Sequence, residues 1–176
     1  MSARIYCIPP HDLQVGLTIP DDFLQGIIGG DWDLNRCRLS ETEKHRSCVQ
    51  HYDHGIPWER TVLFLGEYAG RIAAGEIIRG ATTIEDLAER YRMRLDPVFE
   101  SLKTHGFRLY DDAKTIVLPN VHIGRDGAAI LGSNGNHRVA MAKIIGIEHV
   151  LAHVQAVHVD ADKSTAQTRW DLIDSG

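Results

Sequence analysis

The spacing of apolar positions predicts two consecutive helices in the middle of the chain. Thr83 and Asp86 form a near capping box ahead of apolar residues that recur at helical spacing, so a helix is expected to begin there and to end near Leu95. Asp96–Pro97 is typical of an N-cap followed by a first helical turn, and it predicts a second helix that ends at Gly106. Together the two helices give a helix–turn–helix outline.

Short apolar runs bounded by turn residues predict strands near both ends of the chain and after the helices. These strands are expected over residues 4–8, 115–123, 128–131 and 150–159. Gly124–Gly127 contains Asp-Gly at a position that hairpins favour, so it is expected to join two antiparallel strands. Apolar residues at helical spacing over 136–145, followed by Gly146, predict a helix before the last strand.

These elements predict an α/β fold with a small mixed sheet and flanking helices. The chain has 176 residues, of which 43% are apolar and 24% are charged, and this composition suffices for one buried core. We therefore expect a single domain over residues 1–176, with its core at 83–159. Residues 20–80 are expected to be an elaboration of this core. Residues after 160 are expected to form a tail or a short helix around Trp170.

Composition excludes several classes of protein. No apolar run approaches the roughly 18 residues that a membrane-spanning helix needs. Residues 1–10 lack the apolar core of a secretory signal, so a cytoplasmic protein is expected. The three cysteines include no Cys-x-x-Cys pair and favour neither a disulfide framework nor a thiolate zinc site. A net charge of −5, from 19 basic and 24 acidic residues, does not favour a nucleic-acid partner.

One segment has the character of a phosphate-binding loop. It lies between a predicted strand and a predicted helix, where backbone N–H groups and the helix dipole favour an anion. Asn136 can cap the helix, His137 can donate to an oxygen, and Arg138 presents a planar fork of donors. The candidate phosphate ligands are Gly132, Ser133, Asn134, Gly135, Asn136, His137 and Arg138. The alternative is an ordinary capped helix without a ligand.

The order of these elements resembles the ParB N-terminal and sulfiredoxin superfamily. Over residues 96–154 the chain has a helix ending in Gly106, a strand pair around Gly124–Gly127, and Gly135-Asn-His-Arg138 leading into a helix. In that superfamily a Gly-x-x-Arg loop holds nucleotide phosphates at the N-terminus of the next helix. The resemblance implies a ParB-like, sulfiredoxin-like fold and a nucleotide ligand, ATP, ADP or CTP, together with Mg²⁺.

The loop differs from that of individual members. Sulfiredoxins carry a reactive Cys where this chain has Asn136, so sulfinic acid reduction through that thiol is not expected. Partition proteins carry Ala where Met141 stands, a further Glu-Asn motif and a DNA-binding domain, so a partition clamp is not expected either. The free serine kinases resemble the loop best, through His-Arg after Gly, although their general base lies in a region that does not align with residues 1–60.

A phosphotransferase also needs carboxylates that hold Mg²⁺ and accept a hydroxyl proton. Asp31 and Asp33 flank Trp32 after two glycines, and in an extended segment both carboxylates point the same way. Together with His137, they are the candidate catalytic residues. The alternative is a surface turn with Trp32 buried in the core.

Two other clusters of polar residues have structural interpretations. Cys48, His51 and His54 fall on one sloping face of a helix, but they lack a fourth ligand. They are interpreted as solvated residues or residues at the edge of the core, so no protein-bound metal is predicted. The basic residues at 90, 92 and 94 have acidic neighbours and are interpreted as a solvated helix face.

The leading functional hypothesis is a nucleotide-dependent phosphotransferase that acts on a small-molecule acceptor, or an NTP hydrolase. The Gly132–Arg138 loop holds the phosphates, and Asp31 or Asp33 serves as metal ligand or base. The alternative is a non-catalytic module that senses a nucleotide or another anion, or contacts a protein through residues 20–80. Nuclease activity and DNA binding through residues 83–106 rank lower, and the oligomeric state is left open. Carboxylates that face the loop would distinguish an enzyme from a module.

Overall fold

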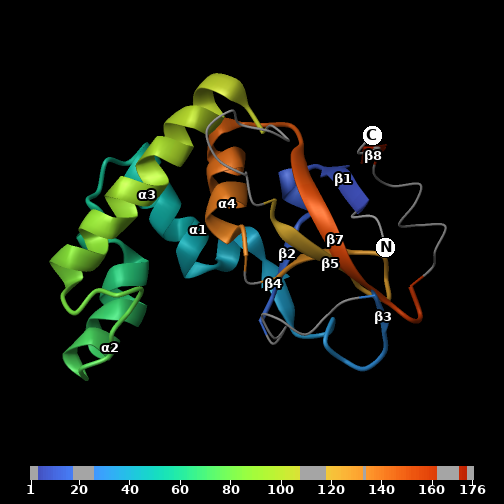
Figure 1. Cartoon of the computed structure of the whole chain (residues 1–176), viewed down its shortest axis with the longest axis horizontal. Helices are drawn as coiled ribbons and strands as arrows, with labels where there is room; N and C mark the ends of the chain where they lie inside the picture. The colour runs from blue at the N-terminus through green and yellow to red at the C-terminus, as the bar shows by residue number, and fades with distance from the viewer. Residues whose placement is uncertain (1–3, 18–25, 108–117, 133, 162–170, 174–176) are drawn as a thin grey trace.

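The computed structural model describes residues 4–17, 26–107, 118–132, 134–161 and 171–173. It confirms the expected α/β fold, in which one mixed sheet lies beside a layer of helices (Figure 1). Among the described helices, none is long and apolar enough to cross a bilayer.

The described part of the sheet contains eight strands. Seven follow the order β4-β2-β6-β5-β7-β1-β8, and β3 pairs with the C-terminal end of β7. The strands are β1 (Arg4–Ile8), β2 (Gln14–Gly16), β3 (Gly26–Ile28), β4 (Arg36–Arg38), β5 (Asn120–Ile123), β6 (Ala129–Leu131), β7 (Val150–His158) and β8 (Asp171–Ile173). Three pairs are parallel: β2 with β6, β3 with β7, and β5 with β7. The other described pairs are antiparallel.

β5 and β6 form the expected antiparallel hairpin around Gly124–Gly127, with Val121 opposite Leu131. Gly132 follows β6, and its N–H donates to the carbonyl of Asn120 at 3.0 Å. The start of the phosphate loop predicted from the sequence therefore lies beside the start of β5. The hairpin turn lies at the opposite end of β6, roughly 10 Å away at the usual rise per residue.

Besides β1 and β2, two further segments outside the expected core add strands to the sheet. β3 and β4 come from residues 20–80 and pair with β7 and β2. β8 pairs with β1 and directly follows Trp170, which itself lies outside the described residues. The strand expected over 115–123 is shorter in the described part, because Pro119 has no N–H to donate and β5 begins after it.

Within the described residues, four α-helices and several short turns form the second layer. The α-helices are α1 (Glu43–Cys48), α2 (Ala69–Ala73), α3 (Ile84–His105) and α4 (Asn136–Ile145). Short 3-10 helices span Pro10–Asp12, Leu39–Glu41 and Trp58–Arg60, and π-helical turns span Val49–Asp53 and Phe64–Tyr68. The predicted cap of α3 is confirmed, since the Thr83 side chain accepts the Asp86 N–H at 3.1 Å.

The break predicted at Asp96 and Pro97 is wrong, because α3 continues through both residues. Pro97 cannot donate to the carbonyl of Met93, but the Met93 side chain is 72% exposed, so that part of the helix is open to water. Asp96 does not cap a helix. Its Oδ1 instead accepts the Tyr52 hydroxyl at 3.1 Å and the Trp58 indole N–H at 3.3 Å. These tertiary hydrogen bonds favour an unbroken helix at this point.

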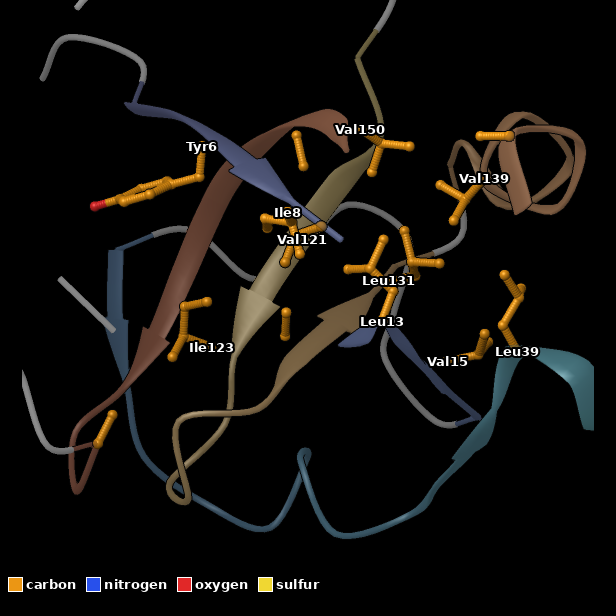
Figure 2. Close-up of a cluster of buried hydrophobic side chains, with 14 residues drawn as sticks. Tyr6, Ile8, Leu13, Val15, Leu39, Val121, Ile123, Leu131, Val139 and Val150 are labelled. Carbon is orange, nitrogen blue, oxygen red and sulfur yellow. The ribbon is translucent and has the colours of Figure 1, made fainter. Parts of the chain in front are cut away.

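α4 lies between two buried clusters. Val139 and Ala142 belong to the cluster that also contains Leu131 of the sheet, and Figure 2 shows Val139 reaching from the helix toward the strands. Ala140 belongs to the helical cluster, which also contains the fully buried Trp58. Because two faces of α4 are buried in different clusters, its N-terminus and the preceding loop are held in place relative to the sheet.

Candidate functional site

A cavity of about 280 Å³, here called the basic cavity, lies at the N-terminus of α4. Residues 134–138 form one wall, and α3, α1 and the turn before α3 contribute the others. Its cationic lining residues are Lys44, Arg79, Arg90, Arg94 and Arg138. No carboxylate from the described part of the chain lines it. A chain with a net charge of −5 thus gathers five cations around one small cavity, which is typical of an anion site.

The phosphate loop predicted from the sequence contains a glycine, Gly135, that no other residue can replace without strain. Gly135 is the N-cap of α4 with a φ of 91°, and a Cβ there would lie 2.6 Å from the Cα of Pro119. Asn136, expected to be the cap, is instead the first residue of the helix, and its side-chain amide donates to the Gly132 carbonyl at 2.9 Å. Ser133, another predicted ligand, lies outside the described residues.

The first turn of α4 presents backbone donors. Its helical hydrogen bonding starts with the Val139 N–H, which donates to the Gly135 carbonyl at 3.0 Å. The N–H groups of His137 and Arg138 therefore have no acceptor within the helix, and they lie at the positive end of the helix dipole. Helix ends of this kind bind phosphate oxygens.

Several cationic side chains of the basic cavity lack a counter-ion. Neither Lys44 nor Arg94 forms an ion pair or hydrogen bond within the described residues. Nη1 of Arg138 is buried and has no hydrogen-bond partner there either. Arg90 differs, because its Nε pairs with Asp86 Oδ1 at 3.1 Å on the helix surface. The cavity thus contains positive charge that the described part of the protein does not neutralise.

Arg79 is held in the cavity wall by an unusual backbone conformation. It is the only non-glycine residue of the described part with a positive φ, 51°, a conformation that costs an L-residue about 1–2 kcal/mol. Arg79 and Gly80 are the central residues of a tight turn in which Ile78 and Ala81 pair. The Arg79 guanidinium lies 5.8 Å from the centroid of the Tyr91 ring. Strain of this kind is commonly retained at functional sites.

The imidazole of His137 is neutral near pH 7. Burial and the surrounding positive charges lower the pKa of its imidazole to about 3. Nε2 is buried without a partner in the described residues, and the Tyr91 ring forms a T-shaped contact with the imidazole, with 5.5 Å between centroids. Burial, followed by the charge of Arg94, also lowers the pKa of the Arg138 guanidinium. The cations that act on His137 are those of Lys44, Arg79 and Arg94.

The structure does not bring Asp31 and Asp33 to the predicted phosphate loop. Both bind Arg125 of the hairpin turn, whose Nη2 lies 2.8 Å from Asp31 Oδ1 and 2.8 Å from Asp33 Oδ1. The Asp33 side chain is 1% exposed and also accepts the Arg125 backbone N–H at 2.8 Å. Burial opposes ionisation of Asp33, but hydrogen bonds from Arg125 outweigh it and hold the pKa of Asp33 below its ordinary value. Neither carboxylate lines the basic cavity.

A second cavity, of about 590 Å³, shares Lys44 and Asn136 with the basic cavity and is here called the acidic cavity. Three carboxylates line it, those of Glu41, Glu43 and Glu67. Glu41 accepts a backbone N–H, and Glu67 pairs with an arginine of α2. The Glu43 carboxylate forms no ion pair or hydrogen bond in the described part of the chain. Carboxylates from the N-terminal third therefore do approach α4, although they are not the two that the sequence predicted.

The remaining candidates from the sequence have structural partners. Trp32 is partly buried and packs against the buried side chains of Ile130 and Ala156. Cys48 is fully buried, which raises the pKa of its thiol to about 12, and Nδ1 of His51 lies 2.8 Å from a backbone carbonyl. Across the described residues, no group of three His, Cys, Asp or Glu side chains is placed to hold a metal ion.

Most of the cations of the basic cavity were not expected from the sequence. Arg90 and Arg94 are four positions apart and share a face of α3, but acidic neighbours favoured a solvated interpretation. Lys44 and Arg79 carry no local signal, because only tertiary packing brings α1 and the turn before α3 to the N-terminus of α4.

Comparisons of the chain with protein-family models, with curated proteins and with solved structures found no match.

Proposed function

We propose that this protein binds a nucleotide through its phosphates, which the basic cavity holds at the N-terminus of α4. The observation that carries the proposal is a cavity with five cations and no carboxylate in its described lining. A buried polar group without a partner costs about 1–3 kcal/mol. A phosphate oxygen would supply a partner for the buried Nη1 of Arg138 and for backbone N–H groups of the first helical turn.

Charge and surface chemistry favour a nucleotide over a simple carboxylate. The cations without a described counter-ion match the several negative charges of a di- or triphosphate better than one carboxylate charge. Leu95 and Val98 add an apolar surface to the cavity, which suits a sugar or a base. The resemblance of Gly135-Asn-His-Arg138 to the phosphate loop of the ParB and sulfiredoxin superfamily supports the same ligand class.

Thermal unfolding with ATP, ADP, CTP and GTP, each with Mg²⁺ and with EDTA, tests the proposal. A ligand at 100 times its Kd stabilises the folded protein by about 2.7 kcal/mol. We expect one or more nucleotides to stabilise the wild type, and to do so in EDTA as well, because the described lining offers cations and no carboxylate to hold Mg²⁺.

Two arginine variants separate the site from general effects of charge. Arg138→Ala removes a cavity cation, whereas Arg92→Ala removes an α3 arginine that pairs with Glu59 and Glu89 outside the cavity. We expect Arg138→Ala to lose the nucleotide-induced stabilisation and Arg92→Ala to keep it. Equal stabilisation of all three proteins, or no response of the wild type to any nucleotide, would contradict the proposal.

Phosphoryl transfer to a small hydroxyl-bearing acceptor is the second candidate function. The observation that favours it is the acidic cavity, which adjoins the basic cavity across Lys44 and Asn136. A carboxylate without a partner, such as that of Glu43, suits a general base for a hydroxyl group. Such a base would take the place of Asp31 or Asp33 in the mechanism.

Release of ADP from ATP and Mg²⁺ tests this second candidate. Free serine, suggested by the resemblance to the free serine kinases, and glycerol are the acceptors to add first. We expect acceptor-dependent release that falls at least tenfold in Glu43→Gln and is unchanged in Glu148→Gln, whose exposed side chain lies outside both cavities. Nucleotide binding without any turnover would instead favour the non-catalytic module.

A further inference from the structure

The imidazole of His137 lies among positive charges from the elements that line the basic cavity. The charged and titratable groups around it are Lys44 on α1, Arg79 in the turn before α3, Arg90, Tyr91 and Arg94 on α3, and Arg138 on α4. No described residue provides a hydrogen-bond partner for its buried Nε2. Before a phosphate binds, the ring is neutral, because burial and the charges of Lys44, Arg79 and Arg94 hold its pKa near 3.

A phosphate in the basic cavity would reverse the field at this ring. Its negative charges would offset the cations that oppose protonation, and its oxygens are acceptors for a charged donor. A neutral imidazole offers less, because one tautomer presents a lone pair to the phosphate and the other donates only an uncharged N–H.

We infer that the basic cavity takes up one proton together with its phosphate ligand, and that His137 holds this proton at Nε2. The inference rests on the proposed function and concerns the same site. The proton comes from the solvent, the imidazole becomes an imidazolium, and its Nε2–H donates to a phosphate oxygen. No bond within the ligand is formed or broken.

Proton uptake makes binding weaker as the pH rises. Between the pKa of His137 in the free protein, about 3, and its higher pKa in the complex, the free ring is neutral and the bound ring is charged. In that window the affinity falls by up to tenfold for each pH unit. A phosphate ester carries its own proton below its second pKa, about 6. Sulfate carries none near neutral pH, so a proton taken up with sulfate must reside on the protein.

Calorimetric titration at pH 7 in several buffers of different ionisation enthalpy measures the protons taken up. The probes are sodium sulfate and ADP in EDTA, and the slope of binding enthalpy against buffer enthalpy gives the stoichiometry. We expect a value approaching one proton per sulfate for the wild type and near zero for His137→Asn. His149→Asn is the matched control, because His149 is exposed beyond the end of α4 and outside the cavity, and it should behave as the wild type.

Imidazole nitrogen chemical shifts provide a second measurement, which is made on the wild type and does not depend on whether a variant folds. On addition of sulfate we expect the His137 signals to move from the neutral to the imidazolium pattern. Anion binding without proton uptake, uptake that persists in His137→Asn, or a ring that stays neutral would each overturn the inference and leave the proposed function intact. Failure of the wild type to bind either anion would overturn both.

Discussion

A Cβ atom on Gly135 would lie 2.5 Å from the Cβ and 2.6 Å from the Cα of Pro119. Pro119 cannot easily move away, because its carbonyl accepts the His153 N–H of the neighbouring strand at 2.9 Å. The start of the sheet hairpin and the start of α4 are therefore packed too closely for a side chain at position 135. This contact fixes the position of the loop that borders the basic cavity.

Replacement of Gly135 by alanine should disrupt this contact. Both the positive φ of 91° and the clash with Pro119 oppose a side chain, so we expect the free energy of unfolding to fall by more than about 2 kcal/mol. Gly146→Ala is the matched control. Gly146 has a φ of 82°, but a Cβ there would meet no atom within 4 Å, so only the backbone cost of about 1–2 kcal/mol applies. Chemical denaturation measures both, and equal losses would refute a role for the contact.

The Asp33–Arg125 pair should contribute to stability and not to ligand binding. Because hydrogen bonds hold the pKa of Asp33 below its unfolded value, their stabilisation is present above the unfolded pKa, about 3.9, and is lost as the pH falls through the folded pKa. Asp33→Asn should therefore lower the free energy of unfolding by about 1–3 kcal/mol at pH 7 and by progressively less below pH 4.

Nucleotide affinity is the second measurement on the same Asp33→Asn protein. We expect its Kd to stay within twofold of that of the wild type, since neither Asp31 nor Asp33 lines the basic cavity. A large loss of affinity in a folded Asp33→Asn protein would return these carboxylates to the site that their sequence pattern suggested.

Arg94→Ala should have the opposite effect to Asp33→Asn, because it should weaken nucleotide binding without lowering stability. Arg94 has no described counter-ion, and its positive charge disfavours the protonated forms of Arg138 and His137. Its removal should leave the ligand-free protein as stable as the wild type, or more stable by up to about 1 kcal/mol. Nucleotide affinity should fall at least tenfold, and the remaining affinity should depend less on salt. Destabilisation of the ligand-free protein together with unchanged affinity would show that Arg94 is a structural residue.

Local sequence signals were sufficient for the parts of the fold that are local in origin. The Asp-Gly turn at 124–127, the helix at 136–145 and the Thr83 cap each depend on residues a few positions apart, and each is present. The break at Asp96 and Pro97 failed because Tyr52 and Trp58, about forty positions away, bind the aspartate. No local pattern contains that contact.

The candidate site shows the same division between local sequence signals and contacts made by distant residues. The loop at 132–138 could be found from its glycines and its position before a helix, but the cations that surround it come from three other segments. Asp31 and Asp33 were chosen for their chemistry alone. Arg125, more than ninety positions later, holds both of them at the opposite end of the hairpin.

Backbone amide shifts during a titration with ADP test the central claim most directly, because they report where the phosphates bind. If the basic cavity holds them, the largest changes should occur at the N–H groups of His137 and Arg138. These groups lie at the positive end of α4 and have no acceptor within the helix. The amides of Asp31 and Asp33 should stay unchanged. Changes concentrated at residues 31–33, with His137 and Arg138 unaffected, would contradict the account.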